Sequence, residues 1–184
     1  RVMHPGGKAL LAIDLDGDLD KELLAGHEQC EELYLFENQG TPDSAFMMDY
    51  TRYFPDSTNP ALFHIFPAGF YEDFDFDDVP DLLVSPNTET NIEYKTDFIN
   101  STYFYKNSGT DNLPVFEFQQ TDFIQEHMLD QGENTCPWLA DYDGDGDLDL
   151  FIAANGYWNG VRYTGYLSLY ENTGNSSAPK FKLK

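Results

Sequence analysis

The sequence predicts an all-β fold of about three four-stranded antiparallel β-propeller blades that form part of a larger propeller. Three observations support this prediction. One pattern recurs three times along the chain, the apolar segments are short and rich in aromatic or β-branched residues, and no stretch shows sustained helical spacing with capping residues. A repeat unit with about four such segments has the size and content of one propeller blade.

Each repeat unit has the same order of parts: an apolar segment, an acidic loop, a second apolar segment, an aromatic segment ending in Asn-x-Gly, and a short aromatic segment. The first unit occupies residues 1–50, the second 67–122 and the third 135–184, with a linker or insertion at 51–66 and a connection at 123–134. Segments such as ELYLFEN and VFEFQQ alternate in polarity, which is typical of strands. We therefore expect four strands in each unit, with the remaining insertions in loops.

The Asn-x-Gly element ends the third strand-like segment of every unit. Its residues are Asn38 and Gly40, Asn107 and Gly109, and Asn172 and Gly174. Both residue types tolerate positive φ, so the sequence predicts that each element closes a hairpin through a turn of that kind.

The composition indicates a globular protein and excludes some partners. The chain has 184 residues, of which 41% are hydrophobic and 16% aromatic, enough for a sizeable core. The formal net charge is −23, with 33 acidic and 10 basic residues, and there is no Lys/Arg cluster for nucleic acid or an anionic membrane surface. No apolar run approaches the ~18 residues of a membrane span. Cys30 and Cys136 make no disulfide framework, and whether they pair stays open.

The acidic residues are concentrated in three nine-residue windows, 14–22, 73–81 and 141–149, which hold 15 of the 33. When each window is numbered from 1 to 9, positions 1, 3, 5 and 9 are acidic in all three. Position 7 is Asp in the first and third windows but Val79 in the second. We therefore expect its backbone carbonyl, rather than its side chain, to act as a ligand. Hard oxygen ligands in this number suit Ca²⁺, which takes 6–8 oxygens at flexible geometry.

Other interpretations of the windows fit less well. Mg²⁺ demands a stricter octahedron, and zinc would want His or Cys, which no window contains. An EF-hand needs a Glu at position 12, where this chain has Ala25, Val84 and Ile152, and its flanking helices are not predicted. Acidic loops kept only for solubility would not retain an acid at position 9, directly before an apolar run, in three units.

The pattern D-x-D-G-D-x-x-x-[DE]-L, followed by a strand and a later [LF]-[YF]-x-N-x-G, resembles the FG-GAP/VCBS repeat family. The resemblance covers nearly the whole chain and implies β-propeller blades, as in integrin α-subunit heads and many bacterial secreted proteins. It also implies up to three Ca²⁺ ions, each held by the side chains at positions 1, 3, 5 and 9 and the carbonyl at position 7. The implied ligands are Asp14, Asp16, Asp18, the Asp20 carbonyl and Glu22; Asp73, Asp75, Asp77, the Val79 carbonyl and Asp81; and Asp141, Asp143, Asp145, the Asp147 carbonyl and Asp149.

The chain departs from the family pattern at two places. Glu22 stands where Asp is usual, and its longer arm should still reach the ion; Asp78 and Pro80 stand where a glycine-containing turn is common. The stretch FPAGFYEDFDFDDVPDLLVSPN, followed by FYKNSGTDNLPVFEFQ, is similar to large secreted proteins of Bacteroidetes, which often carry a type IX secretion signal. This resemblance implies a bacterial protein that is secreted or held at the cell surface.

The sequence contains no nucleophile-elbow, phosphate-loop or zinc-protease motif, so we expect no enzyme activity in this segment. The expected function is a non-catalytic, calcium-stabilised propeller module that mediates adhesion, protein binding or carbohydrate binding. The alternative is an accessory propeller of a secreted polysaccharide-degrading enzyme whose active site lies outside this segment. The remaining blades would come from the same longer chain or from a partner chain. Candidate contacts to a glycan or protein ligand are Tyr157, Trp158 and Tyr163, for which packing between blades is the competing interpretation.

Overall fold

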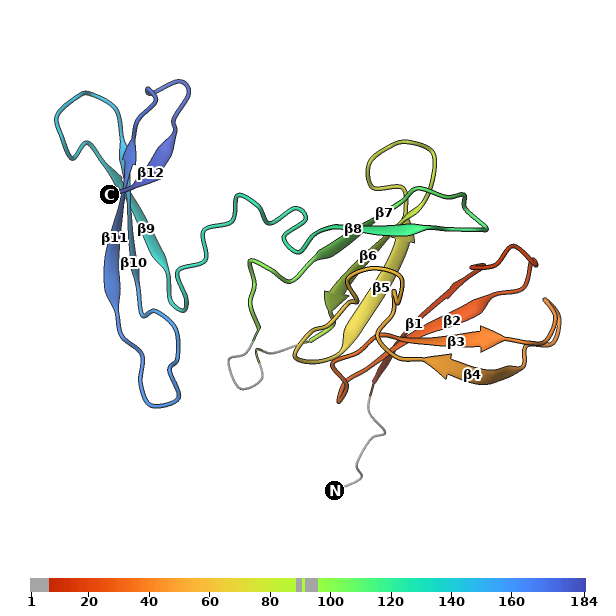
Figure 1. Ribbon diagram of the computed structural model, residues 1–184. Helices are drawn as coiled ribbons and strands as arrows, with labels where there is room; N and C mark the ends of the chain where they lie inside the picture. Colours follow the sequence, from red (N-terminus) through yellow and green to blue (C-terminus); the bar gives the residue numbers. More distant parts are fainter. Residues whose placement is uncertain (1–6, 89–90, 92–95) are drawn as a thin grey trace. The chain divides into compact units, whose positions relative to one another are not determined.

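The computed structural model describes residues 7–88, 91 and 96–184, and in these the chain forms twelve β-strands and no helix. The strands make three four-stranded antiparallel sheets, in which strands that follow each other along the chain lie side by side (Figure 1). This confirms the all-β fold and the three four-stranded antiparallel sheets; their assembly into a propeller stays a prediction. None of the described segments forms a helix that could span a membrane.

The three sheets match the three repeat units of the sequence. The first contains β1 (Lys8–Ile13), β2 (Glu22–His27), β3 (Tyr34–Asn38) and β4 (Met47–Thr51). The second contains β5 (Pro67–Glu72), β6 (Asp81–Pro86), β7 (Tyr103–Asn107) and β8 (Phe116–Gln120). The third contains β9 (Cys136–Ala140), β10 (Asp149–Ala154), β11 (Tyr166–Asn172) and β12 (Phe181–Leu183).

The chain divides into two compact units, Arg1–Met128 and Leu129–Lys184. The first unit holds the β1–β4 and β5–β8 sheets, and the second holds the β9–β12 sheet. The connection expected at 123–134 therefore contains the boundary between the two units.

In the first unit, β5 packs against β1 and β2, and a core forms between the two sheets. Burial alternates along β2, where Leu24 and Gly26 are buried and their neighbours only half-buried, as expected for a strand with one face in the core. Gly26 is needed there because a Cβ at this position would lie 1.6 Å from the carbonyl oxygen of Pro67. On the facing sheet, Leu82 and Val84 are fully buried.

The segment 51–66, expected to be a linker or insertion, contributes to this core. Phe54, Ala61 and Phe63 are buried and belong to the same apolar cluster as Leu82. The ring of Phe54 meets the ring of Phe116 edge-on, with their centroids 6.0 Å apart. The segment is therefore part of the first unit's packing rather than a spacer.

In the second unit, Ile152, Ala154 and Tyr170 of β10 and β11 are buried. Gln131, which precedes the sheet, is tied to it, because its side-chain amide donates to the Tyr170 hydroxyl at 3.0 Å and its carbonyl accepts from the Tyr166 hydroxyl at 2.8 Å. An apolar hollow of about 530 Å³ lies on this sheet. Its lining residues are Pro137, Trp138, Leu139, Leu150 and Phe181.

The Asn-x-Gly elements lie between the third and fourth strand of each sheet, as expected, but the reason expected for the glycine is wrong. Positive φ values occur at other glycines and not at Gly40, Gly109 or Gly174. The glycine is required by a close approach instead: a Cβ on Gly109 would lie 2.4 Å from the carbonyl oxygen of Leu113. Equivalent contacts of 2.2 Å occur at the other two elements. These hairpins fold back so tightly that only hydrogen fits at this position.

Candidate metal centres

Each sheet carries one acidic loop between its first and second strands (Figure 1). Loop 1 is residues 14–22, loop 2 is 73–81 and loop 3 is 141–149, with positions 1 to 9 counted along each. Position 1 directly follows the last residue of the first strand, and position 9 is the first residue of the second strand. The carboxylates grouped by spacing in the sequence therefore occupy equivalent places in three sheets.

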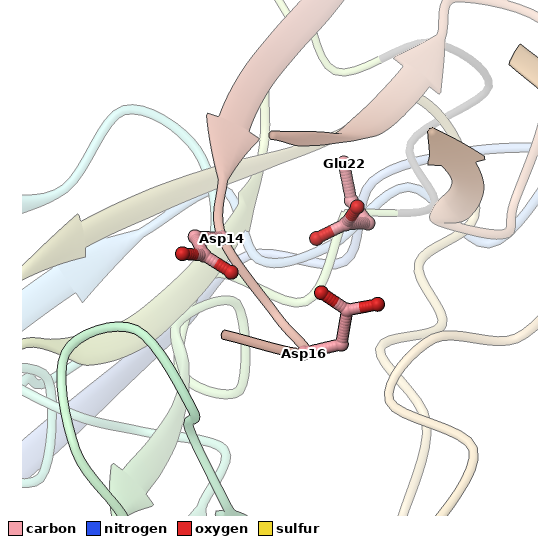
Figure 2. Close-up of side chains that lie close together, drawn as sticks. All are labelled: Asp14, Asp16 and Glu22. Atoms are coloured by element: carbon pink, nitrogen blue, oxygen red, sulfur yellow. The ribbon is translucent and has the colours of Figure 1, made fainter. Parts of the chain in front are cut away.

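The carboxylates at positions 1, 3 and 9 come together in every loop. In loop 1, Asp14, Asp16 and Glu22 each offer one oxygen, and these oxygens lie within 4.8 Å of one another. Figure 2 shows Asp14 and Asp16 on the chain that leaves β1, with Glu22 facing them from the start of β2. The same arrangement forms in the other loops from Asp73, Asp75 and Asp81, and from Asp141, Asp143 and Asp149.

The three loops share one backbone conformation, although their sequences differ. The residues at positions 4 and 6 all have φ between 63° and 92°, in the left-handed region that favours glycine. These residues are Gly17 and Leu19, Phe76 and Asp78, and Gly144 and Gly146. Loop 2 therefore takes the same turn without a glycine at either position, and Asp78 does not prevent it.

The position 1 carboxylate holds this turn by accepting backbone N–H groups. In loop 1, Gly17 and Leu19 donate to the two oxygens of Asp14 at 2.8 and 3.3 Å. In loop 3, Gly144 and Gly146 donate to Asp141 at 2.7 and 3.2 Å. In loop 2, the amides of Asp77 and Asp78 donate to Asp73 at 3.1 and 3.0 Å. A carboxylate oxygen has further lone pairs, so these bonds leave it able to bind a cation.

The position 9 carboxylate ties the loop to its sheet. It accepts the N–H of position 2, from Leu15 to Glu22 at 2.7 Å and from Tyr142 to Asp149 at 2.8 Å. In loops 2 and 3 its second oxygen also accepts, at 2.8 Å, the backbone N–H of the Asn-x-Gly asparagine, Asn107 or Asn172. Loop and third strand are thus joined through one buried acid in each of these two sheets.

Positions 5 and 7 behave differently from the converging carboxylates. The position 5 side chains, Asp18, Asp77 and Asp145, accept the N–H of position 7 at 2.9, 3.0 and 3.0 Å. The position 7 side chains of loops 1 and 3 are buried: Asp20 is 3% exposed and Asp147 is 8% exposed. Oδ1 of each has no hydrogen-bond partner within the part of the chain that the structure describes.

The loops perturb the acidity of their carboxyl groups in both directions. Burial, followed by repulsion from neighbouring aspartates, raises the pKa of Asp20 and of Asp147. Burial also raises the pKa of Glu22. In contrast, the N–H donated by Asn172 lowers the pKa of Asp149, and the Lys106 ammonium lowers the pKa of Asp77. A bound cation would offset the cost of ionising carboxyl groups that are buried beside like charges.

The donor set fits a hard divalent cation. Three carboxylates converge in each loop, and further oxygens at positions 5 and 7 lie along the same short turn. Among the described residues, one buried carboxylate oxygen of Asp20 and one of Asp147 have no hydrogen-bond partner, so this part of the chain does not balance their charge. Oxygen-only ligands in this number are compatible with calcium.

Lys106 was not singled out from the sequence, yet it pairs with carboxylates of loop 2. Its ammonium forms ion pairs with Asp75 and with Asp77, the latter at 2.7 Å. Lys106 directly precedes Asn107 at the end of β7, and the equivalent residues in the other units are Glu37 and Glu171. Alignment of the three units at this column would have revealed the difference.

The aromatic residues proposed as ligand contacts, Tyr157, Trp158 and Tyr163, all belong to the loop between β10 and β11, and the structure brings the last two together. The rings of Trp158 and Tyr163 are 5.1 Å apart at an angle of 55°. The hydroxyl of Tyr157 donates to the carbonyl of Asp130 at 2.8 Å, and this side chain is exposed. Both cysteines are free thiols, Cys30 half-buried and Cys136 exposed.

Comparison with protein-family models, with curated proteins and with solved structures finds no match for this chain. The interpretation of the loops therefore rests on their own residues and geometry.

Proposed function

We propose that this chain is a non-catalytic, calcium-stabilised β-propeller module of a secreted or cell-surface protein. The observation that carries the proposal is the threefold recurrence of one acidic loop. In each sheet the same three positions bring carboxylate oxygens within 4.8 Å of one another, on the same positive-φ turn. A surface that was acidic only for solubility would not repeat this geometry at equivalent hairpins.

A calcium ion in each loop would stabilise the fold by relieving repulsion. Carboxylates this close repel one another, and part of that charge is buried. An ion that binds only the folded state adds RT ln(1 + [L]/Kd), about 2.7 kcal/mol per site at a hundredfold excess over Kd. Extracellular calcium modules often bind at ~10⁻⁴–10⁻³ M, which suits a secreted scaffold.

The propeller part of the proposal is supported by how sheets pack and by the apolar surface they leave. In the first unit two sheets pack face to face through β1, β2 and β5, as neighbouring blades do. In the second unit Trp138, Leu139 and Leu183 are exposed on one sheet, and the first two line its apolar hollow. Such surface is typical of a contact with further blades, from the same longer chain or a partner. The aromatic cluster of the β10–β11 loop is the proposed contact for a glycan or protein ligand.

Thermal unfolding tests the calcium proposal. We expect the melting temperature of the 184-residue chain to rise with CaCl₂ and to fall with EDTA, reversibly. The variant Asp141→Asn should lose part of this rise, because it weakens one of the three loops. Lys8→Met, which changes an exposed residue at the far end of β1 from loop 1, should retain the full rise. A melting temperature that does not change with Ca²⁺ would contradict the proposal.

A further inference from the structure

Loop 2 is paired with a lysine from another part of its sheet, the end of β7. Lys106 places its ammonium between the carboxylates of Asp75 and Asp77, at positions 3 and 5 of the loop. The lysine is held there by its neighbour, because Asn107 is buried at 2% exposure and donates its N–H to Asp81 at 2.8 Å. The side chain of Lys106 is 36% exposed, and it reaches the loop from the end of β7, which lies between β6 and β8.

The other two loops have the opposite charge at this place. Glu37 and Glu171 occupy the position of Lys106, and Glu171 pairs with Lys184 at 3.1 Å. The Lys184 ammonium lies near loop 3, 5.2 Å from the centre of the Tyr142 ring, but among the described residues its ion pair is with Glu171 and not with a carboxylate of that loop.

A second difference within the loops follows the first. Where loops 1 and 3 bury Asp20 and Asp147, each with an unpartnered oxygen, loop 2 has Val79. Loop 2 thus gains an ammonium and loses the buried carboxylate, and both changes reduce its need for an external cation. Two independent positions, one in the loop and one on β7, therefore change the charge of the site in the same direction.

We propose that Lys106 is the built-in counter-ion of loop 2 and makes the three loops unequal: loops 1 and 3 fill with a divalent cation first, and loop 2 binds it weakly and last. This rests on the proposed calcium function and assigns a specificity-determining residue within it. A divalent cation at loop 2 must displace the ammonium from two carboxylates and then remain close to it. Loss of two exposed ion pairs and repulsion between the like charges together weaken binding by about tenfold or more.

Calcium titration of the metal-free 184-residue chain by isothermal calorimetry tests the inference, with CaCl₂ alone as the probe. We expect two classes of site, two tight and one weaker. Asp73→Asn should remove the weak class, while Asp14→Asn and Asp141→Asn should each remove one tight site. Lys106→Met should tighten the weak site by about tenfold or more, and Lys106→Glu, which gives loop 2 the residue of the other units, should tighten it further.

Lys8→Met serves as the matched control, because it removes one exposed positive charge at the end of β1 remote from loop 1. It should leave all three affinities unchanged within about twofold. Three equal sites in the unsubstituted chain, or a weak site that Lys106→Met does not tighten, would overturn the inference while leaving the calcium function standing. Absence of any calcium binding would overturn the proposed function and, with it, the inference.

Discussion

At the scale of single residues, position 7 of the loops is a buried aspartate in loops 1 and 3 and a valine in loop 2. Asp20 and Asp147 each bury a carboxylate with one oxygen that has no partner in the described part of the chain, and Val79 stands at the same position in loop 2. Burying an unpaired charge is unfavourable, and the raised pKa of both aspartates has that origin. If only the backbone carbonyl of position 7 binds the ion, the buried side chain destabilises the metal-free protein and contributes no ligand.

The variant Asp147→Val tests this role. We expect the melting temperature in EDTA to rise by a few degrees, because the buried charge is replaced by an apolar side chain of similar size. The affinity of loop 3 for Ca²⁺ should fall by no more than about tenfold, because the carbonyl and the other carboxylates remain. Calorimetry and thermal unfolding measure the two effects. If Asp147→Val abolishes binding to loop 3 as fully as Asp141→Asn, the side chain is itself a ligand.

Backbone strain in loop 2 gives a second prediction at this scale. Phe76 has φ of 63° and is 90% exposed, so it occupies a left-handed conformation without compensating burial. Gly146 has φ of 92°, and a Cβ there would meet nothing within 4 Å. We expect Gly146→Ala to cost about 1 kcal/mol in the free energy of unfolding through φ alone, and Phe76→Gly to cost nothing or to stabilise slightly. Urea unfolding measures both, and a destabilised Phe76→Gly would show that its ring makes contacts that matter.

At the scale of elements, the Asn-x-Gly asparagine connects the third strand, the following hairpin and the acidic loop. The Oδ1 of Asn107 accepts from Gly109 and Val115, both at 2.9 Å. Its Nδ2 donates to the carbonyl of Pro80 in loop 2 at 2.9 Å. The side chain therefore replaces several backbone hydrogen bonds that a tight hairpin cannot make within itself.

We expect Asn107→Ala to lower the free energy of unfolding by about 3 kcal/mol, because it leaves buried N–H and C=O groups without partners. Asn38→Ala should cost about 2 kcal/mol. Asn38 accepts the equivalent pair of bonds from Gly40 and Phe46, but among the described residues its Nδ2 makes no counterpart of the bond that Asn107 donates to the carbonyl of Pro80. Chemical denaturation of the two variants gives the comparison. Equal costs would mean that the link between loop and hairpin adds nothing.

The sequence predicted the features that depend on local pattern. Alternating short segments predicted the strands, and the repeated spacing of carboxylates predicted that Asp14, Asp16 and Glu22 share one site. Features that depend on distant contacts were not predicted. Lys106 meets Asp75 only because β7 ends beside the loop, and Phe54 enters the core because its segment folds back onto β8. The glycine of Asn-x-Gly was expected for its φ, whereas the structure requires it for the approach of Leu113.

At the scale of the whole molecule, the net charge of −23 and the perturbed acids together determine how stability depends on pH. Asp20 and Asp147 have pKa values raised above 3.8, so the folded state binds protons more readily than the unfolded chain. Their ionised forms destabilise the metal-free fold at neutral pH, and this effect disappears as the pH falls through the raised values. Asp77 and Asp149 have pKa values below 3.8, so their stabilisation is complete above that pH and is lost only below it.

Calcium should reverse the direction of this dependence. In EDTA, we expect the melting temperature to rise as the pH is lowered from neutrality toward the raised pKa values of Asp20 and Asp147, since these acids become protonated and the net negative charge falls. With saturating Ca²⁺ the melting temperature should be higher at pH 7 and should fall over the same range, because protons compete with the metal for the carboxylates. The double variant Asp20→Val, Asp147→Val should flatten the EDTA curve and thereby separate the buried acids from the general charge. If the melting temperature depends on pH in the same way with and without Ca²⁺, the ion does not act through these carboxylates. If the metal-free protein loses stability as the pH falls over this range, the buried aspartates do not determine its pH dependence.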